Sequence, residues 1–165
     1  PFELPAAVID ADALNALADT PEWWANTQAR LILTPHPGEL ARLRGTTVEA
    51  IQADRVTAAA EAAAAWRQVV VLKGAFTVVA APDRRAVILP FANPALASAG
   101  TGDVLAGAIA GMLAQGLAPE SAAVVGAYVH GLAGELAREA LGEAGVLATD
   151  LLPLVPEAMQ QLRGE

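Results

Sequence analysis

The sequence predicts an α/β fold in which a mostly parallel sheet carries helices on both faces. Short apolar runs alternate along the chain with amphipathic or alanine-rich segments, as they do in layered α/β proteins. Residues 69–72 (Val-Val-Val-Leu) are continuously apolar, which is typical of a strand buried on both faces of a parallel sheet. Residues 77–80 and 86–89 flank a Pro-Asp-Arg-Arg turn and predict a small antiparallel hairpin, so the sheet is expected to be mixed.

The first part of the chain predicts strands that each lead into a turn and a helix. Residues 7–9 form a short apolar strand, and residues 13–17 have the spacing of an amphipathic helix. A second strand at residues 31–33 stops at residues 34–38 (Thr-Pro-His-Pro-Gly), where two prolines exclude regular pairing or helix. Residues 47–66 predict a single alanine-rich helix capped by its first threonine.

The last part of the chain is mainly helical. The expected helices run from the Gly-Thr-Gly-Asp segment to about residue 115, from 119 to about 141, and from 151 to 162, where Pro153 and Pro156 confine the regular part. Gly107 and Gly111 lie one helical turn apart, and we expect them to allow close packing against another helix. His130 lies in an apolar helical segment and is expected to be a hydrogen-bonded core residue rather than a ligand.

Composition limits the classes of function. The chain has 165 residues, 55% of them hydrophobic, which is enough for one domain with a core. A formal net charge of -8 argues against broad contact with nucleic acid or anionic lipid. The absence of cysteine excludes disulfides, thiolate nucleophiles and cysteine metal sites, and agrees with a cytoplasmic protein. Polar residues interrupt every apolar run before it could span a membrane. Because the chain starts at Pro1 without a methionine, we expect it to be part of a longer protein.

The most informative segment is residues 100–107, Gly-Thr-Gly-Asp-Val-Leu-Ala-Gly, at the start of a predicted helix. Two glycines remove side chains where the backbone turns, so successive N–H groups can point at one anion near the positive helix end. Asp103 falls in the first turn, where a carboxylate can accept a proton from a hydroxyl or help to hold a metal on a nucleotide. The alternative is a tight turn in which Asp103 only caps the helix.

Polar residues also follow each of the buried strands, and ligands of open α/β sheets bind at the carboxyl ends of strands. His36 is fixed between two prolines and can bind a carbonyl or phosphate with little ordering cost, or can bond to backbone as a structural residue. Lys73 can face a ligand or extend to solvent. Asp10 and Asn15 are expected at the floor of the site, with helix capping as the alternative. Glu39 can act through water on a nucleotide-bound metal, or can serve as an ordinary first-turn acidic residue.

Four segments resemble, in the same order, the signatures of the NAD(P)H-hydrate dehydratases, a family of the ribokinase-like superfamily. They are residues 8–15 (Val-Ile-Asp-Ala-Asp-Ala-Leu-Asn), 34–39 (Thr-Pro-His-Pro-Gly-Glu), 73–77 (Lys-Gly-Ala-Phe-Thr) and 93–107, which begins with Asn-Pro and contains the Gly-Thr-Gly-Asp run. The last segment is shared by ribokinase-like enzymes, whereas residues 34–39 narrow the resemblance to the dehydratases. The resemblance therefore implies a ribokinase-like layered fold for residues 1–165, as a partial domain that lacks its N-terminal portion.

The resemblance also implies roles for individual residues. Asp103 would be the catalytic base and would face the hydrated nicotinamide substrate together with His36. The adenine nucleotide site would comprise Lys73, Gly74, Ala75, Phe76, Thr77 and Gly102. The anion hole would comprise Gly100, Thr101 and Gly102, and the site floor Asp10, Asn15, Glu39 and Asn93.

The implied activity is the repair of a damaged cofactor. The family dehydrates the S epimer of NADH hydrate or NADPH hydrate by transferring a phosphoryl group from ADP or ATP, with Mg²⁺, to the ring hydroxyl and then eliminating phosphate. The resemblance also implies a cytoplasmic homotetramer. Two alternatives stay open at this point: a ribokinase-like kinase of a vitamin precursor or sugar, and a non-catalytic nucleotide-binding remnant.

Overall fold

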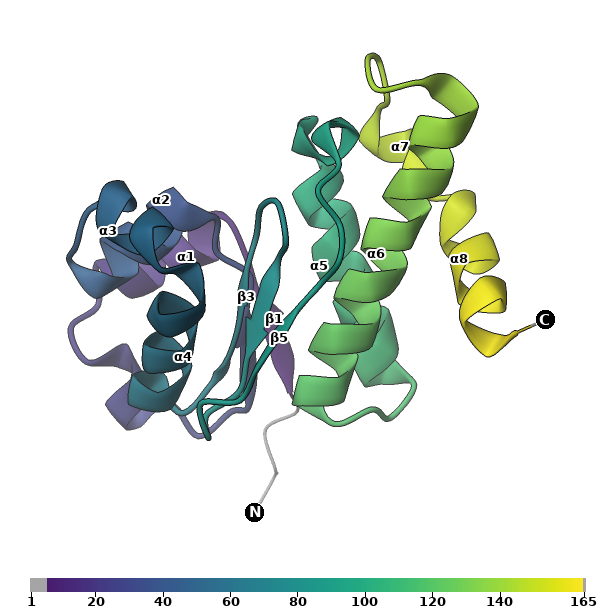
Figure 1. The fold of residues 1–165 in the computed structure, drawn as a ribbon. Helices are drawn as coiled ribbons and strands as arrows, with labels where there is room; N and C mark the ends of the chain where they lie inside the picture. Colours follow the sequence, from purple (N-terminus) through teal and green to yellow (C-terminus); the bar gives the residue numbers. More distant parts are fainter. Residues whose placement is uncertain (1–5, 165) are drawn as a thin grey trace.

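The computed structural model describes residues 6–164, so residues 1–5, which include the unusual start at Pro1, lie outside the described residues. A single five-stranded sheet forms the centre (Figure 1). In sheet order the strands are β1 (Ala7–Ile9), β2 (Leu31–Leu33), β3 (Val69–Leu72), β4 (Val78–Ala80) and β5 (Ala86–Ile88). β1, β2 and β3 are mutually parallel, and β4 pairs antiparallel with both β3 and β5. Only β4 therefore opposes the other described strands, which confirms the mostly parallel sheet and its hairpin.

Helices cover both faces of this sheet (Figure 1). One face carries α1 (Asp12–Ala18), α2 (Pro37–Arg44), α3 (Val48–Ala53) and α4 (Arg55–Trp66). The other carries α5 (Thr101–Ala114) and α6 (Pro119–Leu141), with α8 (Leu154–Arg163) packed on α6. The remaining short helices are η1 (Trp23–Asn26), η2 (Pro94–Ala97) and α7 (Ala148–Leu151). None of the helices within residues 6–164 combines the length and the apolarity needed to cross a membrane.

β3 shows why the sheet needs two helical layers. Side chains of a strand alternate between faces, and all four residues of β3 are apolar and buried. Val70 and Leu72 pack into the core beneath α4, whereas Val69 and Val71 pack into the core beneath α5 and α6. A continuous apolar run is thus satisfied only because helices cover the sheet on both faces.

The helix expected over residues 47–66 is in fact two helices. Thr47 caps α3 by accepting a hydrogen bond from the backbone N–H of Ala50 at 3.3 Å. At Asp54 the backbone leaves the helical region, and the Asp54 carboxylate accepts from Thr57 N at 3.0 Å to cap α4. The prediction failed because a side chain that caps one helix competes with the backbone hydrogen bonds that would continue the previous one. Arg55 consequently becomes the first residue of α4.

Two further predictions about helix boundaries were wrong. Pro37 does not exclude helix, because α2 begins at this residue; a proline at the first helical position lacks only an N–H that would have no partner there. The last predicted helix, residues 151–162, is divided into α7 and α8. Asp150 lies inside α7, and its carboxylate accepts from Leu147 N at 2.8 Å.

Glycine packing between α5 and α6 also differs from the expectation. A Cβ built on Gly107 or Gly111 would meet nothing within 4 Å, so these glycines do not mediate close packing within the described chain. The close contact is made from the other helix, where a Cβ on Gly126 would lie 2.7 Å from the Ile109 backbone. The four-residue spacing of Gly107 and Gly111 does not indicate which side of α5 faces α6. In the structure these two glycines lie on the side of α5 that faces away from α6.

Candidate functional site

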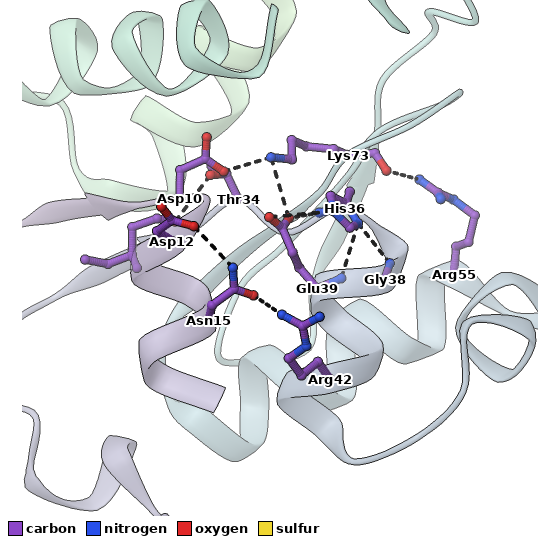
Figure 2. A network of polar contacts seen from close by, with 11 residues as sticks. Asp10, Asp12, Asn15, Thr34, His36, Gly38, Glu39, Arg42, Arg55 and Lys73 are labelled. Atoms are coloured by element: carbon purple, nitrogen blue, oxygen red, sulfur yellow. Dashed lines mark hydrogen bonds and ion pairs between the residues drawn. The ribbon is translucent and has the colours of Figure 1, made fainter. Parts of the chain in front are cut away.

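A cluster of polar residues lies where β1, β2 and β3 end, beside the start of α5 (Figure 2). The ammonium group of Lys73 is at its centre, with Nζ 2.7 Å from Asp10 Oδ1 and 3.7 Å from Glu39 Oε2. Only 20% of the Lys73 side chain is exposed, so it does not extend to solvent. One cation shared by two largely buried carboxylates leaves this cluster with a net negative charge, and it fixes the ammonium group in place.

The start of α5 lies directly against this cluster. A Cβ on Gly102 would be 3.6 Å from Lys73 Nζ and 3.9 Å from Asp10 Oδ2, so the glycine leaves room for the charged groups beside the helix. Gly100 precedes the helix in a left-handed conformation, with φ 86°, and α5 has no side-chain cap. Within the described residues, the N–H groups of Gly100 and Gly102 have no hydrogen-bond acceptor. This helix end can therefore receive an anion.

Asp103 and Thr101 differ in whether their polar groups are free to bind a ligand. Asp103 is exposed in the first turn of α5, and its carboxylate makes no hydrogen bond within residues 6–164. Thr101 is buried; its hydroxyl lies 2.6 Å from the carbonyl oxygen of Leu96, and its N–H donates to Ser98 O at 3.3 Å. Thr101 thus shapes the turn, while Asp103 remains free to take part in chemistry.

His36 is the N-cap of α2. Its Nδ1 accepts hydrogen bonds from Gly38 N at 3.0 Å and from Glu39 N at 3.2 Å, and its own N–H donates to Glu39 Oε2 at 2.7 Å. A ring nitrogen that accepts two backbone N–H groups needs its lone pair, so the neutral imidazole carries its proton on Nε2. The side chain is 57% exposed and Nε2 lies 3.6 Å from Glu39 Oε1, beyond hydrogen-bond distance, so this donor is accessible. Nδ1 of His36 thus has a structural role as the helix cap, while Nε2–H can still donate to a ligand.

The two residues expected at the site floor near β1 lie in different places. Asp10 joins Lys73 and does not cap a helix, because Ala11 is the N-cap residue of α1 and no side chain caps this helix start. Asn15 accepts a hydrogen bond from Arg42 and donates to Asp12 at 3.5 Å, so it links α1 to α2 outside the Lys73 cluster (Figure 2).

The loop of residues 73–77 has an unusual backbone. Gly74 has φ 139° and Phe76 has φ 53°, and the left-handed region costs a residue with a side chain about 1 kcal/mol or more. Three hydrogen bonds hold the loop: Lys73 N to Pro35 O at 2.9 Å, Thr77 Oγ1 to Gly74 O at 3.0 Å, and Phe76 N to Phe91 O at 2.7 Å. The surrounding structure thus imposes a conformation that the sequence of the loop would not adopt alone.

A cavity of about 330 Å³ opens beside this loop and the start of α5. Six of the predicted site residues line it: Lys73, Gly74, Ala75, Thr77, Asn93 and Gly102. Phe76 does not line it, because its left-handed backbone turns the ring outward and leaves the residue 52% exposed. Asn93 accepts from Ala95 N at 2.9 Å, which fixes the side chain at the wall of the cavity. The volume falls in the range of small-molecule pockets.

Phe91 and His130 are among the cavity-lining residues that were not predicted as site residues. Phe91 supplies an apolar wall and the carbonyl that holds Phe76. His130 is 8% exposed and lies 2.9 Å from the carbonyl oxygen of Thr101 through Nε2, which confirms it as a satisfied core residue. Burial lowers the pKa of His130 to about 4, against the opposing effect of this hydrogen bond. His130 is thus neutral at pH 7 and donates to the first turn of α5, and no local sequence signal indicates that contact.

The described residues contain no group of three His, Cys, Asp or Glu side chains that could hold a metal ion. A magnesium ion carried on nucleotide phosphates needs only one or two carboxylates, because water and phosphate oxygens complete its coordination. Asp103 offers an unpaired carboxylate, while Glu39 and Asp10 are already bound to Lys73. The donor set therefore fits a nucleotide-borne metal and does not fit a metal bound by protein groups alone.

Comparison with known sequences gives a consistent family. The family model described as NAD(P)H-hydrate dehydratase matches residues 2–157. A bifunctional NAD(P)H-hydrate repair enzyme of Moorella thermoacetica is 50% identical over 159 residues, which cover 96% of this chain and 30% of that protein. An ADP-dependent (S)-NAD(P)H-hydrate dehydratase of Neisseria meningitidis is 47% identical over 149 residues, covering 88% of this chain and 50% of that protein. The chain thus spans half or less of these curated relatives.

Solved structures agree with the sequence comparison. The ADP/ATP-dependent NAD(P)H-hydrate dehydratase of Bacillus subtilis, co-crystallised with ATP and Mg²⁺, has a TM-score of 0.86 and 36% identity, covering 94% of this chain and 55% of that chain. A hydroxyethylthiazole kinase of Pyrococcus horikoshii has a TM-score of 0.72 at 22% identity, covering 91% of this chain and 59% of that chain, which shows a shared fold alone.

Proposed function

This chain belongs to the NAD(P)H-hydrate dehydratase family, and we propose that it carries the nucleotide-dependent dehydratase site of a longer protein. The reaction restores NADH or NADPH from the S epimer of its hydrate at the expense of ADP or ATP. One observation carries this proposal: the uncapped start of α5, with free Asp103, lies against the Asp10–Lys73–Glu39 cluster and a cavity of about 330 Å³. An anion site, a free carboxylate and a nucleotide-sized pocket are thus adjacent.

Asp103 is the general base of this reaction. Its carboxylate takes the proton of the ring hydroxyl as the hydroxyl oxygen bonds to the terminal phosphorus of the nucleotide and the bond to the nucleotide oxygen breaks. The bond between the ring carbon and the former hydroxyl oxygen then breaks, phosphate leaves with that oxygen, and loss of a proton from the neighbouring ring carbon forms the double bond of the reduced nicotinamide. The N–H groups of Gly100 and Gly102 stabilise negative charge on the transferring phosphoryl group, because neither has another acceptor in residues 6–164.

The cavity beside residues 73–77 binds the adenine nucleotide. Its wall is largely apolar and includes Phe91 and Leu105, which suits a purine ring. The N–H groups at the start of α5 attract the phosphates from one end of the cavity. When bound on those phosphates, Mg²⁺ would neutralise part of their charge, and Glu39 is the residue that would hold it, through water.

His36 orients the hydrated nicotinamide. Because Nδ1 is occupied by the α2 backbone, His36 acts through Nε2–H as a hydrogen-bond donor, for example to a carbonyl oxygen of the substrate. The same bonds hold the ring in place, so little entropy is lost when the substrate binds.

We further propose that the chain is one part of a larger domain and acts in a homotetramer in the cytoplasm. The matched residues cover only 55% of the Bacillus subtilis chain, so that protein has structure beyond the shared part. Exposed leucines at positions 141, 147 and 152 offer an apolar surface near α7 for association between subunits.

The test is recovery of the near-ultraviolet absorbance of reduced nicotinamide when the protein is mixed with NADH hydrate, Mg²⁺ and either ADP or ATP. Recovery that depends on nucleotide and vanishes in Asp103→Asn supports the proposal and identifies the phosphoryl donor. Phosphoryl transfer to a simple alcohol such as a vitamin precursor, without recovery of NADH, would favour the kinase. Nucleotide binding without any turnover, even in a longer chain that spans the full length of its relatives, would favour the non-catalytic remnant.

A further inference from the structure

Arg55, the first residue of α4, makes an unusual set of contacts at the start of the loop of residues 73–77. Its NH2 group donates to the carbonyl oxygens of Leu72 at 3.2 Å and Lys73 at 3.3 Å, and NH1 donates to Gln52 Oε1 at 3.2 Å. Figure 2 shows the guanidinium group at the main chain of Lys73, on the opposite side from Asp10. These contacts hold the end of β3 at the point where the loop of residues 73–77 begins.

The position of Arg55 is not explained by the stability of α4. A cation in the first turn of a helix opposes the helix dipole. The side chain is half-buried, its pKa is lowered by desolvation, and no carboxylate pairs with it within residues 6–164. Arg44 offers a contrast: it donates to the Ala58 carbonyl at 3.1 Å, but its charge is paired with Glu61 at 2.7 Å. The cost of placing an unpaired cation at this helix start therefore calls for a compensating role.

Gly74 is matched to the guanidinium group. A Cβ on Gly74 would lie 3.1 Å from both NH1 and NH2 of Arg55, so the absence of a side chain lets the guanidinium lie against the Gly74 backbone. Gly74 also has φ 139°, which residues with a side chain rarely adopt. The contact thus fixes an unusual backbone conformation between Lys73, which reaches the charged cluster, and Ala75, which lines the cavity.

We propose that Arg55 is a positioning residue for nucleotide binding: it clamps the Lys73–Gly74 main chain and so holds the loop of residues 73–77 in its binding conformation. The inference rests on the proposed function, because the ligand of this loop is the adenine nucleotide. The clamp supplies contacts that favour the positive φ values of Gly74 and Phe76 in this loop. Part of the nucleotide affinity comes from this preorganisation, since a loop that is already ordered loses less entropy on binding.

The first test is made without nucleotide. Amide hydrogen exchange is measured by NMR for Arg55→Gln and, as the matched control, for Arg44→Gln, which removes a bond to a backbone carbonyl of α4 and none to the loop. We expect the amide of Phe76 to exchange about tenfold faster in Arg55→Gln only, because removing one net hydrogen bond to a charged group costs roughly that factor or more. Equal exchange rates at Phe76 in the two variants would overturn the clamp.

The second test measures affinity for ADP and ATP with Mg²⁺ by calorimetry. We expect Arg55→Gln to bind the nucleotides about tenfold more weakly. The affinity of Arg55→Lys should be intermediate, because lysine keeps the charge but lacks the planar, forked donors of the guanidinium group. Arg44→Gln should bind like the unchanged protein. Arg55→Lys also keeps the test valid if Arg55→Gln fails to fold. Equal affinity in all variants would overturn the inference and leave the proposed function standing. No binding by the unchanged protein would reject the nucleotide site itself, while the exchange measurement still decides whether Arg55 holds the loop.

Discussion

Two helix starts border the same site and are finished in opposite ways. The start of α2 is closed: His36 Nδ1 accepts from two backbone N–H groups, and Glu39 accepts from the His36 N–H. The start of α5 is open, with a left-handed glycine in place of a capping side chain and N–H groups that lack an acceptor in the described chain. A capped helix start is finished by the protein itself, whereas an uncapped one beside a cavity is left for a ligand. The start of α2 thus positions side chains, whereas the start of α5 keeps N–H groups that can receive an anion.

The largest effect is expected at the open helix. Asp103→Asn should lower the dehydration rate by about a hundredfold to ten-thousandfold, because the amide cannot accept the hydroxyl proton. Its melting temperature should stay nearly unchanged, since the Asp103 carboxylate makes no hydrogen bond in residues 6–164. Rate and thermal unfolding are measured on the same preparation. A large fall in stability with the rate preserved would instead assign Asp103 to helix capping.

A pH dependence of the unfolding free energy should come from His130, which donates to the Thr101 carbonyl in the first turn of α5. The folded pKa of His130 is about 4, below the unfolded value of about 6.5, so the unfolded chain binds the proton first as pH falls. This stabilising contribution is fully present above pH 6.5 and is lost towards pH 4, amounting to about 3 kcal/mol. Urea unfolding across this range measures it.

The control for that effect is His130→Gln, which keeps a donor for Thr101 and removes the titrating group. Its unfolding free energy should depend less on pH than that of the unchanged protein. The same pH dependence in both proteins would place the titration elsewhere and would leave His130 without the predicted contribution.

Substitutions of His36 can separate its contribution to capping α2 from its contribution to the reaction. His36→Ala should lose about 1 kcal/mol of stability together with activity, because the N-cap acceptor is removed. His36→Asn should recover much of the stability, since asparagine is a good N-cap, and should remain slow because the donor at Nε2 is not reproduced. Thermal unfolding and turnover of NADH hydrate provide the two readouts. Full activity in His36→Asn would mean that capping is the only role of this residue.

The smallest effect is expected on the outward side of α5. Gly107→Ala should stabilise the chain by about 0.5–1 kcal/mol, because alanine favours helix and the added Cβ meets nothing within 4 Å. Gly126→Ala is the matched control and should destabilise, since its Cβ would lie 2.7 Å from the Ile109 backbone. If Gly107→Ala is destabilising instead, this side of α5 is covered by another segment or subunit.

Much of the framework could be predicted from local patterns. Each strand was placed correctly, because its apolar run has the length and burial of a strand in a two-faced sheet. The start of α5 at Thr101 followed from the Gly-x-Gly-Asp run. Helix interruptions were harder: Asp54 separates α3 from α4 through its own side-chain cap, and the alanine-rich context concealed that competition.

The sequence predicted which residues belong to the site, but it did not predict how those residues contact one another. Sequence placed Asp10, Glu39 and Lys73 after successive strands, and parallel strands bring their carboxyl ends to one edge. It could not say that Lys73 pairs with Asp10 across 63 residues of sequence. Nor could it separate Asn15, which links α1 to α2, from the cluster.

The sequence by itself determined the order of strands and helices, the position of Asp103 in the first turn of α5, and the edge of the sheet where polar groups gather. These are local properties, set by side-chain period, glycine conformation and helix-start preferences within a few residues. Only the tertiary structure decided that Arg55 clamps Lys73 and Gly74, that His130 holds Thr101, and that Phe76 turns outward. Such contacts join residues distant in sequence, so they depend on which elements pack together, and no local pattern contains that information.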